Sequence, residues 1–221
     1  MTLDEQLAKM RATMAKEIPA EIREQMHIEN ETLRASGMLE RAIKPGDPLP
    51  PFEMPNYTGE TISSEALLAE GPLVISFFRG HWCPYCAVEL YALREIVDDL
   101  KALGANLVAM TPTLPEFNKA QIEKRRLNFP LLTDRGNDYA EGIGIRFVLA
   151  EVLQKAYANV GGIDLPTING DPSWTLPIPT RLVIDPGGIV RAVDMDPDYT
   201  YRPEPSKSVA DVRALVDAAA A

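Results

Sequence analysis

The 221-residue sequence has little cysteine, little histidine and no excess of positive charge. With only two cysteines it cannot be a scaffold held together by several disulfides. Its 32 acidic residues outnumber its 22 basic ones, giving a net charge of −10, which disfavours nucleic acids and anionic membrane surfaces as partners. The strongest apolar run, Leu73–Phe78, is far shorter than the roughly 18 residues of a transmembrane helix. We therefore expect a globular protein with a core of its own.

Residues 1–18 contain no apolar stretch of the signal-peptide type, because charged residues interrupt the apolar ones throughout. We therefore expect the protein to act in the cytoplasm, where thiols are kept reduced. Both cysteines fall in one short window, Cys83-Pro-Tyr-Cys86. In a reducing compartment such a pair is more often redox-active or metal-binding than structural.

Residues 1–44 are predicted to form a helical extension, the arm, ahead of one domain over residues 45–221. Proline marks this boundary, since it is rare before residue 45 and frequent after it. Pro19 suits the first turn of a second helix in the arm. Apolar residues of the first helix recur at spacings of 4, 3, 4 and 4, which puts them on one face: Leu3, Leu7, Met10, Met14 and Ile18. Either the protein's own domain or a second subunit of a homodimer is expected to cover this face.

From residue 45 onward, predicted strands alternate with predicted helices. The strands are expected at Leu73–Phe78, Leu107–Met110, Phe129–Leu132 and in a hairpin of Leu182–Ile184 with Ile189–Val193. The helices are expected from the cysteine pair to Leu100, from a capping box at Thr113–Glu116 to Leu127, over Phe147–Tyr157, and after a Ser208 cap. This order predicts an α/β fold in which helices cover both faces of a mixed sheet.

The cysteine pair lies between a buried strand and a helix, which makes it more than a chance match. Cys83 is expected at the helix N-terminus, where unpaired backbone N–H groups and the helix dipole lower the pKa of a thiol. Cys86 follows one turn later, close enough for the two sulfurs to bond. Pro84 suits the first helical position. The arrangement favours a Cys83 thiolate that attacks and a more buried Cys86 that resolves the product.

A zinc site and an inert buried pair are the alternatives. Zinc usually takes four ligands, and beyond the two cysteines the chain has only His27 and His81. His81 is two residues from Cys83 on a tight turn, whereas His27 lies in the arm. Redox chemistry is the favoured interpretation, and no metal is expected.

Several motifs carry a resemblance to known families. The segment Trp82-Cys-Pro-Tyr-Cys86, with Ile178-Pro179-Thr180 before a later strand, resembles the thioredoxin superfamily. More narrowly, the chain is similar to the alkyl hydroperoxide reductase/thiol-specific antioxidant family, in its peroxiredoxin-like branch with a Cys-x-x-Cys. The motifs that carry this likeness are Pro45–Phe52, Phe77–Cys83 and Val183–Val190. The resemblance covers about residues 45 to 215.

The resemblance implies a thioredoxin-like, peroxiredoxin-type fold and a thiol-dependent peroxidase. Cys83 would attack hydrogen peroxide or an organic hydroperoxide and become a sulfenic acid, and Cys86 would form a disulfide with it. A thioredoxin-type or glutathione-type donor would reduce that disulfide. Pro179 would be the superfamily's cis-proline beside the pair. The resemblance implies no cofactor.

The chain departs from the family pattern at three places. Standard members carry a proline seven residues and a threonine three residues before the attacking cysteine, where this chain has Ser76 and Gly80. We therefore expect a slower peroxide step. The family's arginine position is occupied by Pro179, which leaves Arg181 and Arg79 as the candidate cations near the thiolate.

Two further residues and two other functions stay open at this point. His81 is a candidate donor to the thiolate or a turn residue, and Trp82 is a candidate shield and docking surface or a packing residue. A dithiol–disulfide oxidoreductase of the thioredoxin or glutaredoxin kind would use the same pair. A non-enzymatic redox sensor would instead rearrange the arm when the pair oxidises.

Overall fold

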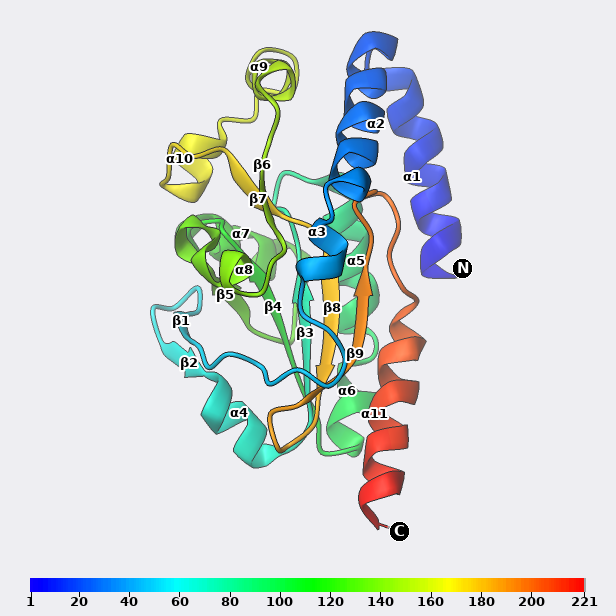
Figure 1. The fold of residues 1–221 in the computed structure, drawn as a ribbon, viewed down its shortest axis with the longest axis vertical. Helices are drawn as coiled ribbons and strands as arrows, with labels where there is room; N and C mark the ends of the chain where they lie inside the picture. Colours follow the sequence, from blue (N-terminus) through cyan, green and yellow to red (C-terminus); the bar gives the residue numbers. More distant parts are fainter. Residues whose placement is uncertain (221) are drawn as a thin grey trace.

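The centre of the molecule is a five-stranded mixed sheet (Figure 1), seen in a computed structural model that describes residues 1–220. The strand order is β5-β4-β3-β8-β9. Three strands are parallel: β3 (Leu73–Phe77), β4 (Asn106–Thr111) and β5 (Leu131–Thr133). Next to β3, strands β8 (Thr180–Ile184) and β9 (Val190–Met195) form the predicted antiparallel hairpin.

Helices are spread along the whole chain. The longer ones are α1 (Leu3–Glu17), α2 (Ala20–Ala35), α5 (Pro84–Arg94), α7 (Pro115–Arg125), α9 (Glu151–Asn159) and α11 (Pro205–Ala220). The shorter ones are α3 (Met38–Arg41), α4 (Ser64–Glu70), α6 (Val97–Ala102), α8 (Asp138–Gly142), α10 (Leu165–Asn169) and a 3-10 turn at Arg135–Asn137. Two short antiparallel pairs complete the fold: β1 (Glu53–Pro55) with β2 (Thr61–Ser63), and β6 (Arg146–Val148) with β7 (Thr175–Pro177).

Helices and loops cover both faces of the sheet, as the side chains of β3 demonstrate. All five of its residues are buried. Val74 joins one core, built with residues of α1, α5, α6 and α11. Ile75 and Phe77 join a second core on the opposite face, which includes Ala140 of α8. A strand buried on both faces has a continuous apolar sequence. The predicted α/β class with a covered mixed sheet is confirmed.

The arm folds back onto the domain of its own chain. Helix α1 starts at a capping box made by Thr2 and Glu5. Leu3 and Leu7 are buried in the same core as α5. The backbone N–H groups at the start of α1 also donate to the carboxylate of Glu204. The first half of the predicted apolar face, Leu3 and Leu7, is therefore buried within one chain, while Met14 and Ile18 are partly exposed and line a cleft.

Replacing Leu7 by alanine should destabilise the whole protein, because this side chain is 0% exposed in the main core. We expect the free energy of unfolding in urea to fall by about 2–5 kcal/mol. Ile28 of α2, which is 46% exposed, provides the control, and its alanine variant should change that free energy by less than about 0.5 kcal/mol. Equal stability of the Leu7 variant and the parent would mean that α1 is not part of the cooperative unit.

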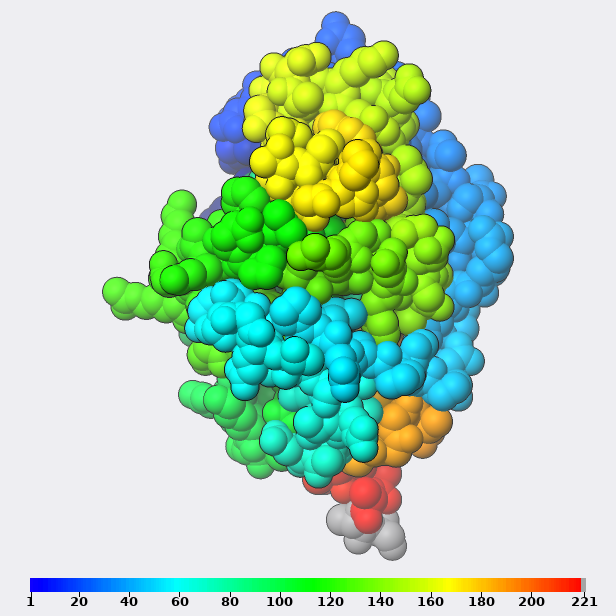
Figure 2. Space-filling view, turned by 90° about the vertical axis from the view of Figure 1, so that its left-hand side faces the viewer, coloured from blue at the N-terminus to red at the C-terminus, as the bar shows by residue number. Residues whose placement is uncertain are grey.

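A small layer around residues 146–177 lies beside the arm. In Figure 2 this α9–α10 region, yellow-green to yellow, forms the upper part of the visible face, above the β1–β2 pair and α4 in cyan. Leu153 and Tyr157 of α9 lie in its core, and Ile22 and Met26 of α2 pack against them. The arm therefore contacts the α9 layer as well as α5.

Two predicted helices have different bounds in the structure. The helix expected after a capping box at Thr113–Glu116 is α7, which begins at Pro115 without a side-chain cap. The Thr113 hydroxyl is instead hydrogen-bonded to the hydroxyl of Thr111 at 3.1 Å. The helix expected over Phe147–Tyr157 is shorter, because its first residues pair with β7 as strand β6. Periodicity alone does not distinguish a short buried strand from a helix.

Two more predicted helix features are wrong in detail. Ser208 does not cap the last helix, because α11 begins earlier and the Ser208 hydroxyl accepts a hydrogen bond of 3.2 Å from Arg181. The helix after the cysteine pair is interrupted at Glu95 and Ile96, whose backbone N–H groups donate to carbonyls three residues back. It therefore splits into α5 and α6. Their buried side chains still form the apolar face that was predicted.

Candidate dithiol site

Cys83 occupies the N-cap position of α5, directly after the turn that follows β3. Pro84 is the first helical residue, as predicted, and no side chain caps the helix. The backbone N–H of Cys83 donates to the carbonyl of Gly80 at 3.2 Å, which closes the turn. The Cys83 sulfur thus lies at the positive end of the helix dipole, where a thiolate is stabilised.

The geometry of this turn explains why residue 80 is a glycine. Its φ of 152° is rarely adopted by other residues, and a Cβ added there would lie 2.5 Å from Nε1 of Trp82. The added Cβ would also lie 3.1 Å from the hydroxyl oxygen of Thr113. Trp82 therefore fills the space that a side chain at position 80 would take.

The two thiols are free and buried, with exposed fractions of 1% for Cys83 and 0% for Cys86. Burial acts to raise the pKa of Cys83, but the hydrogen bond from Cys86 and the charges of Arg79 and Arg202 outweigh it and lower this pKa to about 6. Burial raises the pKa of Cys86 well above its ordinary value, and the negative charge of Cys83 raises it further. The pair therefore consists of one thiolate and one thiol at neutral pH.

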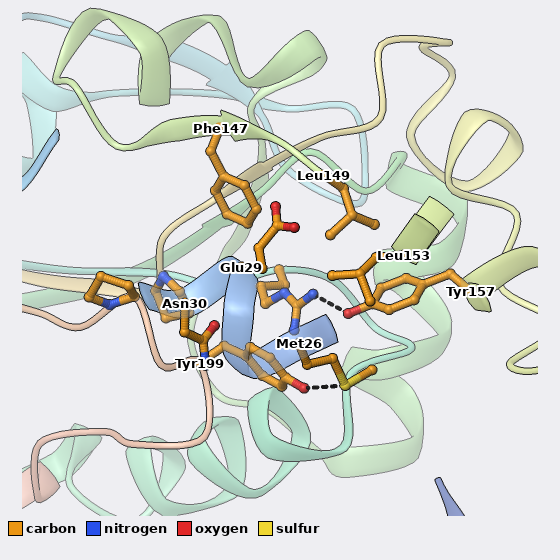
Figure 3. A pocket seen from close by; sticks show the side chains of 11 residues that line it. Met26, Glu29, Asn30, Phe147, Leu149, Leu153, Tyr157 and Tyr199 are labelled. Atoms are coloured by element: carbon orange, nitrogen blue, oxygen red, sulfur yellow. Dashed lines mark hydrogen bonds between the residues drawn. The ribbon is translucent and has the colours of Figure 1, made fainter. Parts of the chain in front are cut away.

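Arg79 is a fully buried cation beside the pair, with an exposed fraction of 2%. Its Nη2 donates to the hydroxyl of Tyr157 at 2.5 Å, a bond drawn in Figure 3. Its guanidinium carbon lies 3.9 Å from the ring centre of Tyr199 and 5.0 Å from that of Trp82. Within residues 1–220 it forms no ion pair with a carboxylate, and its Nε has no hydrogen-bond partner. The Cys83 thiolate is the negative charge that compensates it.

Arg202 is a second buried cation, which the sequence interpretation missed. Its Nη2 lies 3.5 Å from Sγ of Cys86, and its Nε donates to Glu89 at 2.6 Å. Because 116 residues separate Arg202 from Cys86, no local spacing connects them. The available signal was Glu89, a carboxylate on the apolar face of α5, since a buried carboxylate requires a cationic partner.

Cys83 opens onto a cleft of about 410 Å³, which we call the dithiol cleft. Arg79 and Trp82 line it beside Cys83. Most of the remaining wall is apolar and comes from the arm and α9: Met14, Ile18, Ile22, Met26, Ala156 and Val160. The arm is therefore a wall of the site and not only a stabilising attachment.

A small cavity of about 10 Å³, shown in Figure 3, shares Arg79, Tyr157 and Tyr199 with the lining of this cleft. Glu29 and Asn30 of α2 line it, together with Tyr157 and Tyr199. Burial raises the pKa of the Glu29 carboxyl, while the N–H of Ala150 and the charge of Arg79 act to lower it. The Tyr199 hydroxyl donates to the Met26 sulfur at 3.2 Å, which ties the loop after β9 to the arm.

Two of the four remaining predicted candidates, His81 and Trp82, lie in the turn before Cys83. The ring of His81 stacks on Phe117 at 5.1 Å, and burial, with the charge of Arg125, lowers its pKa. His81 is therefore neutral at neutral pH and offers no positive charge to the thiolate. Trp82 packs edge-on against Tyr157 at 5.4 Å and lines the dithiol cleft beside Cys83.

Arg181 is engaged elsewhere. Its guanidinium forms ion pairs with Asp194 and Asp211 and donates to Ser208. Among residues 1–220, no hydrogen bond links Arg181 to either cysteine. Its ion pairs join β8, β9 and α11.

Pro179 lines the small cavity beside Arg79, but its peptide bond is not cis as expected from the resemblance. All peptide bonds within the described residues are trans. The trans form is the ordinary state of an X–Pro bond, and here it leads the chain directly from β7 into β8. Pro179 therefore lies near Arg79, but the predicted cis isomer is wrong.

No cluster of three or more His, Cys, Asp or Glu side chains among residues 1–220 could hold a metal ion. No helix in the same part of the chain is both long and apolar enough to span a bilayer.

The mixed sheet with helices on both faces, together with one thiol at a helix N-terminus and a second thiol one turn later, defines a thioredoxin-like fold with a candidate dithiol site. The family model of the AhpC/TSA family matches residues 45–193. The chain belongs to the AhpC/TSA family.

Relatives and solved structures agree with this assignment. Peroxiredoxin Bcp of Escherichia coli is 31% identical over 103 residues, which are 47% of this chain and 65% of that protein, just under two thirds of its length. The crystal structure of peroxidoxin BcpB from Mycobacterium tuberculosis aligns with a TM-score of 0.62 at 24% identity, over 78% of this chain and 98% of that chain. Reduced Prx3 of Vibrio vulnificus, solved in complex with hydrogen peroxide, aligns with a TM-score of 0.59 at 18% identity, over 78% and 99%. These structures show the peroxiredoxin-type fold.

Proposed function

We propose that the protein is a thiol-dependent peroxidase in which Cys83 attacks the peroxide. The observation that carries this proposal is the position of the buried Cys83 sulfur at the N-cap of α5, on a cleft that it shares with the buried cation Arg79. The pKa of Cys83 is lowered to about 6 at this position. The Cys83 thiolate attacks one peroxide oxygen, the O–O bond breaks, and the sulfenic acid forms while the other oxygen leaves as water or an alcohol after taking a proton. Arg79 is proposed to stabilise the negative charge before and during this step.

Cys86 is proposed to resolve the product. Its sulfur attacks the sulfenic sulfur, the S–S bond forms, and the S–O oxygen leaves with the Cys86 proton as water. A thioredoxin-type dithiol or a glutathione-type thiol in the cytoplasm then reduces the disulfide. Membership of the AhpC/TSA family supports this cycle. We also propose that residues 45–221 carry the chemistry and that the arm, residues 1–44, supplies a wall of the substrate cleft.

The dithiol cleft supports an organic hydroperoxide as well as hydrogen peroxide. Its wall is mainly apolar, and its volume of about 410 Å³ exceeds what hydrogen peroxide needs. Burial of apolar surface should favour an alkyl or aryl hydroperoxide in binding.

A dithiol–disulfide oxidoreductase is the second candidate. It is favoured by Gly80, which has no hydroxyl to hold a peroxide where standard family members have threonine, and by Ser76 in the usual proline position. A redox sensor is a further alternative, since Tyr199 links the site to Met26 of the arm.

Stopped-flow mixing of the reduced protein with hydrogen peroxide, cumene hydroperoxide or oxidised glutathione tests these proposals. We expect the two peroxides to oxidise Cys83 faster than oxidised glutathione does, with the aryl hydroperoxide ahead. Because the pKa of Cys83 is about 6, the rate should be nearly constant above pH 7 and fall as the pH drops through 6, where the thiolate is protonated. Fast mixed-disulfide formation with sluggish peroxide reaction would establish the oxidoreductase instead.

A further inference from the structure

Four hydrogen bonds, one of them to the Cys86 sulfur, hold the guanidinium of Arg202 next to Cys86. It lies in the loop between β9 and α11, and its side chain is 2% exposed. Nε donates to Glu89 at 2.6 Å, and Nη1 donates to the carbonyls of Tyr199 and Tyr201 at 2.6 and 2.7 Å. Nη2 points to Sγ of Cys86 at 3.5 Å. With Nε and Nη1 held in this way, Nη2 is held against the sulfur.

Glu89 is fixed as firmly as Arg202. Its side chain is 7% exposed, and its second carboxylate oxygen accepts a hydrogen bond of 3.1 Å from the hydroxyl of Ser76 on β3. Ser76 stands where standard family members carry proline, which has no hydroxyl to donate. The departure at this position thus belongs to a buried network that ends at Cys86.

We propose that Arg202 is a catalytic residue that stabilises negative charge on the Cys86 sulfur, with Glu89 as the positioning residue that orients it. This inference rests on the proposed dithiol cycle. As Cys86 gives up its proton and attacks the Cys83 sulfenic acid, Arg202 faces the developing thiolate while the S–S bond forms and water leaves. When a donor thiolate attacks Cys83 of the disulfide, the S–S bond breaks and Cys86 leaves with the electron pair, again facing Arg202.

The two cations then act mainly at different stages of the cycle, although both lower the pKa of Cys83 in the resting state. Arg79 compensates the resting charge on Cys83, whereas Arg202 acts when the charge moves to Cys86. Burial raises the pKa of Cys86, and Arg202 is the cation that opposes this effect. A cation held in a buried site acts more strongly than one in water, so its loss should slow the steps that put charge on Cys86 more than the attack on peroxide.

The kinetic test separates the two steps in the full chain. The double variant Glu89→Gln/Arg202→Gln removes both buried charges without leaving either one unpaired, and Arg202→Lys retains a positive charge. Because Arg202 also contributes to the lowered pKa of Cys83, the mixing with hydrogen peroxide is carried out at about pH 9, where Cys83 remains largely ionised, and sulfenic acid should then form at a rate close to the parent's. Disulfide formation should then be slower by about tenfold or more in the double variant, with partial recovery in Arg202→Lys. The control is Arg181→Gln/Asp194→Asn, which removes a buried arginine and one of its two carboxylate partners away from the cysteines and should leave both phases unchanged.

A second measurement does not depend on peroxide. In the Cys83→Ser background, the ultraviolet absorbance of the Cys86 thiolate should rise at a higher pH in Glu89→Gln/Arg202→Gln than with the native pair, a comparison that leaves no unpaired charge at Glu89. If the parent forms no sulfenic acid with peroxide, the peroxidase proposal fails, and this titration still tests Arg202. An unchanged disulfide-forming phase in a folded double variant, or an unchanged ionisation of Cys86, would overturn the role of Arg202.

Discussion

Replacing Cys83 by serine is expected to reduce peroxide consumption to the uncatalysed background and to abolish disulfide exchange. Cys83 is the thiol with the lowered pKa, of about 6, and a serine hydroxyl at this site provides no comparable nucleophile. Replacing Cys86 by serine should leave the first turnover intact, because the attacking thiolate and Arg79 remain. The product should then accumulate on Cys83, since the resolving thiol is missing.

The trapped species distinguishes the proposed functions. After one equivalent of peroxide, the Cys86→Ser variant should show a sulfenic acid by mass spectrometry with a sulfenic-specific reagent. A mixed disulfide with a small thiol or a protein, without sulfenic acid, would indicate an oxidoreductase. Alkylation of the reduced parent at neutral pH gives the control, and if Cys86 reacted faster than Cys83 the division of roles would be wrong.

Replacing Arg79 by glutamine is expected to slow peroxide reduction by about ten- to thirtyfold at pH 7. The hydrogen bond from Cys86 lowers the pKa of Cys83 more than Arg79 does, and Arg202 lowers it as well, so loss of Arg79 should raise this pKa from about 6 only part of the way toward the ordinary thiol value of about 8.5. The thiolate fraction at pH 7 then falls, and the charge that develops during attack on the peroxide loses its nearby cation. The loss should shrink as the pH rises, because hydroxide then ionises the thiol. The measurement is the rate of sulfenic acid formation against pH.

The pH profile also provides the control for misfolding. A variant that had lost its fold would not recover its activity at higher pH, and the circular dichroism spectrum should match that of the parent. If the Arg79→Gln variant kept the parental profile, with its fall near pH 6, Arg79 would not be the cation that supports Cys83.

The central part of the fold could be predicted because the signals there are local and dense. The buried strand, the Cys-Pro-Tyr-Cys window and the helix after it follow one another without a gap, so Cys83 at the N-cap and Cys86 on the buried face could be predicted. The apolar spacing in the arm likewise identified the buried face of α1. The predicted caps failed where a hydroxyl makes a different bond in the structure, as Ser208 does with Arg181.

The rest of the site depends on contacts between distant segments. Arg202, in the loop after β9, contacts Cys86 from 116 residues away, and Tyr157 contacts Arg79 from 78 residues away. No hydrophobic period and no local spacing of residues in the sequence predicts such long-range contacts. The resemblance also led to a cis bond at Pro179, which the structure does not contain.

The dithiol cleft combines two parts of the chain that differ in their relation to the family. Both cysteines and Arg79 lie within residues 45–193, the segment that the family shares, whereas Met14, Ile18, Ile22 and Met26 come from the arm that precedes it and Arg202 comes from the segment that follows it. Part of the cleft wall is therefore encoded outside the stretch that holds the two thiols. A change of N-terminal helices alone could give the same dithiol a differently shaped entrance, so new hydroperoxide preferences can evolve without any change to the reacting groups.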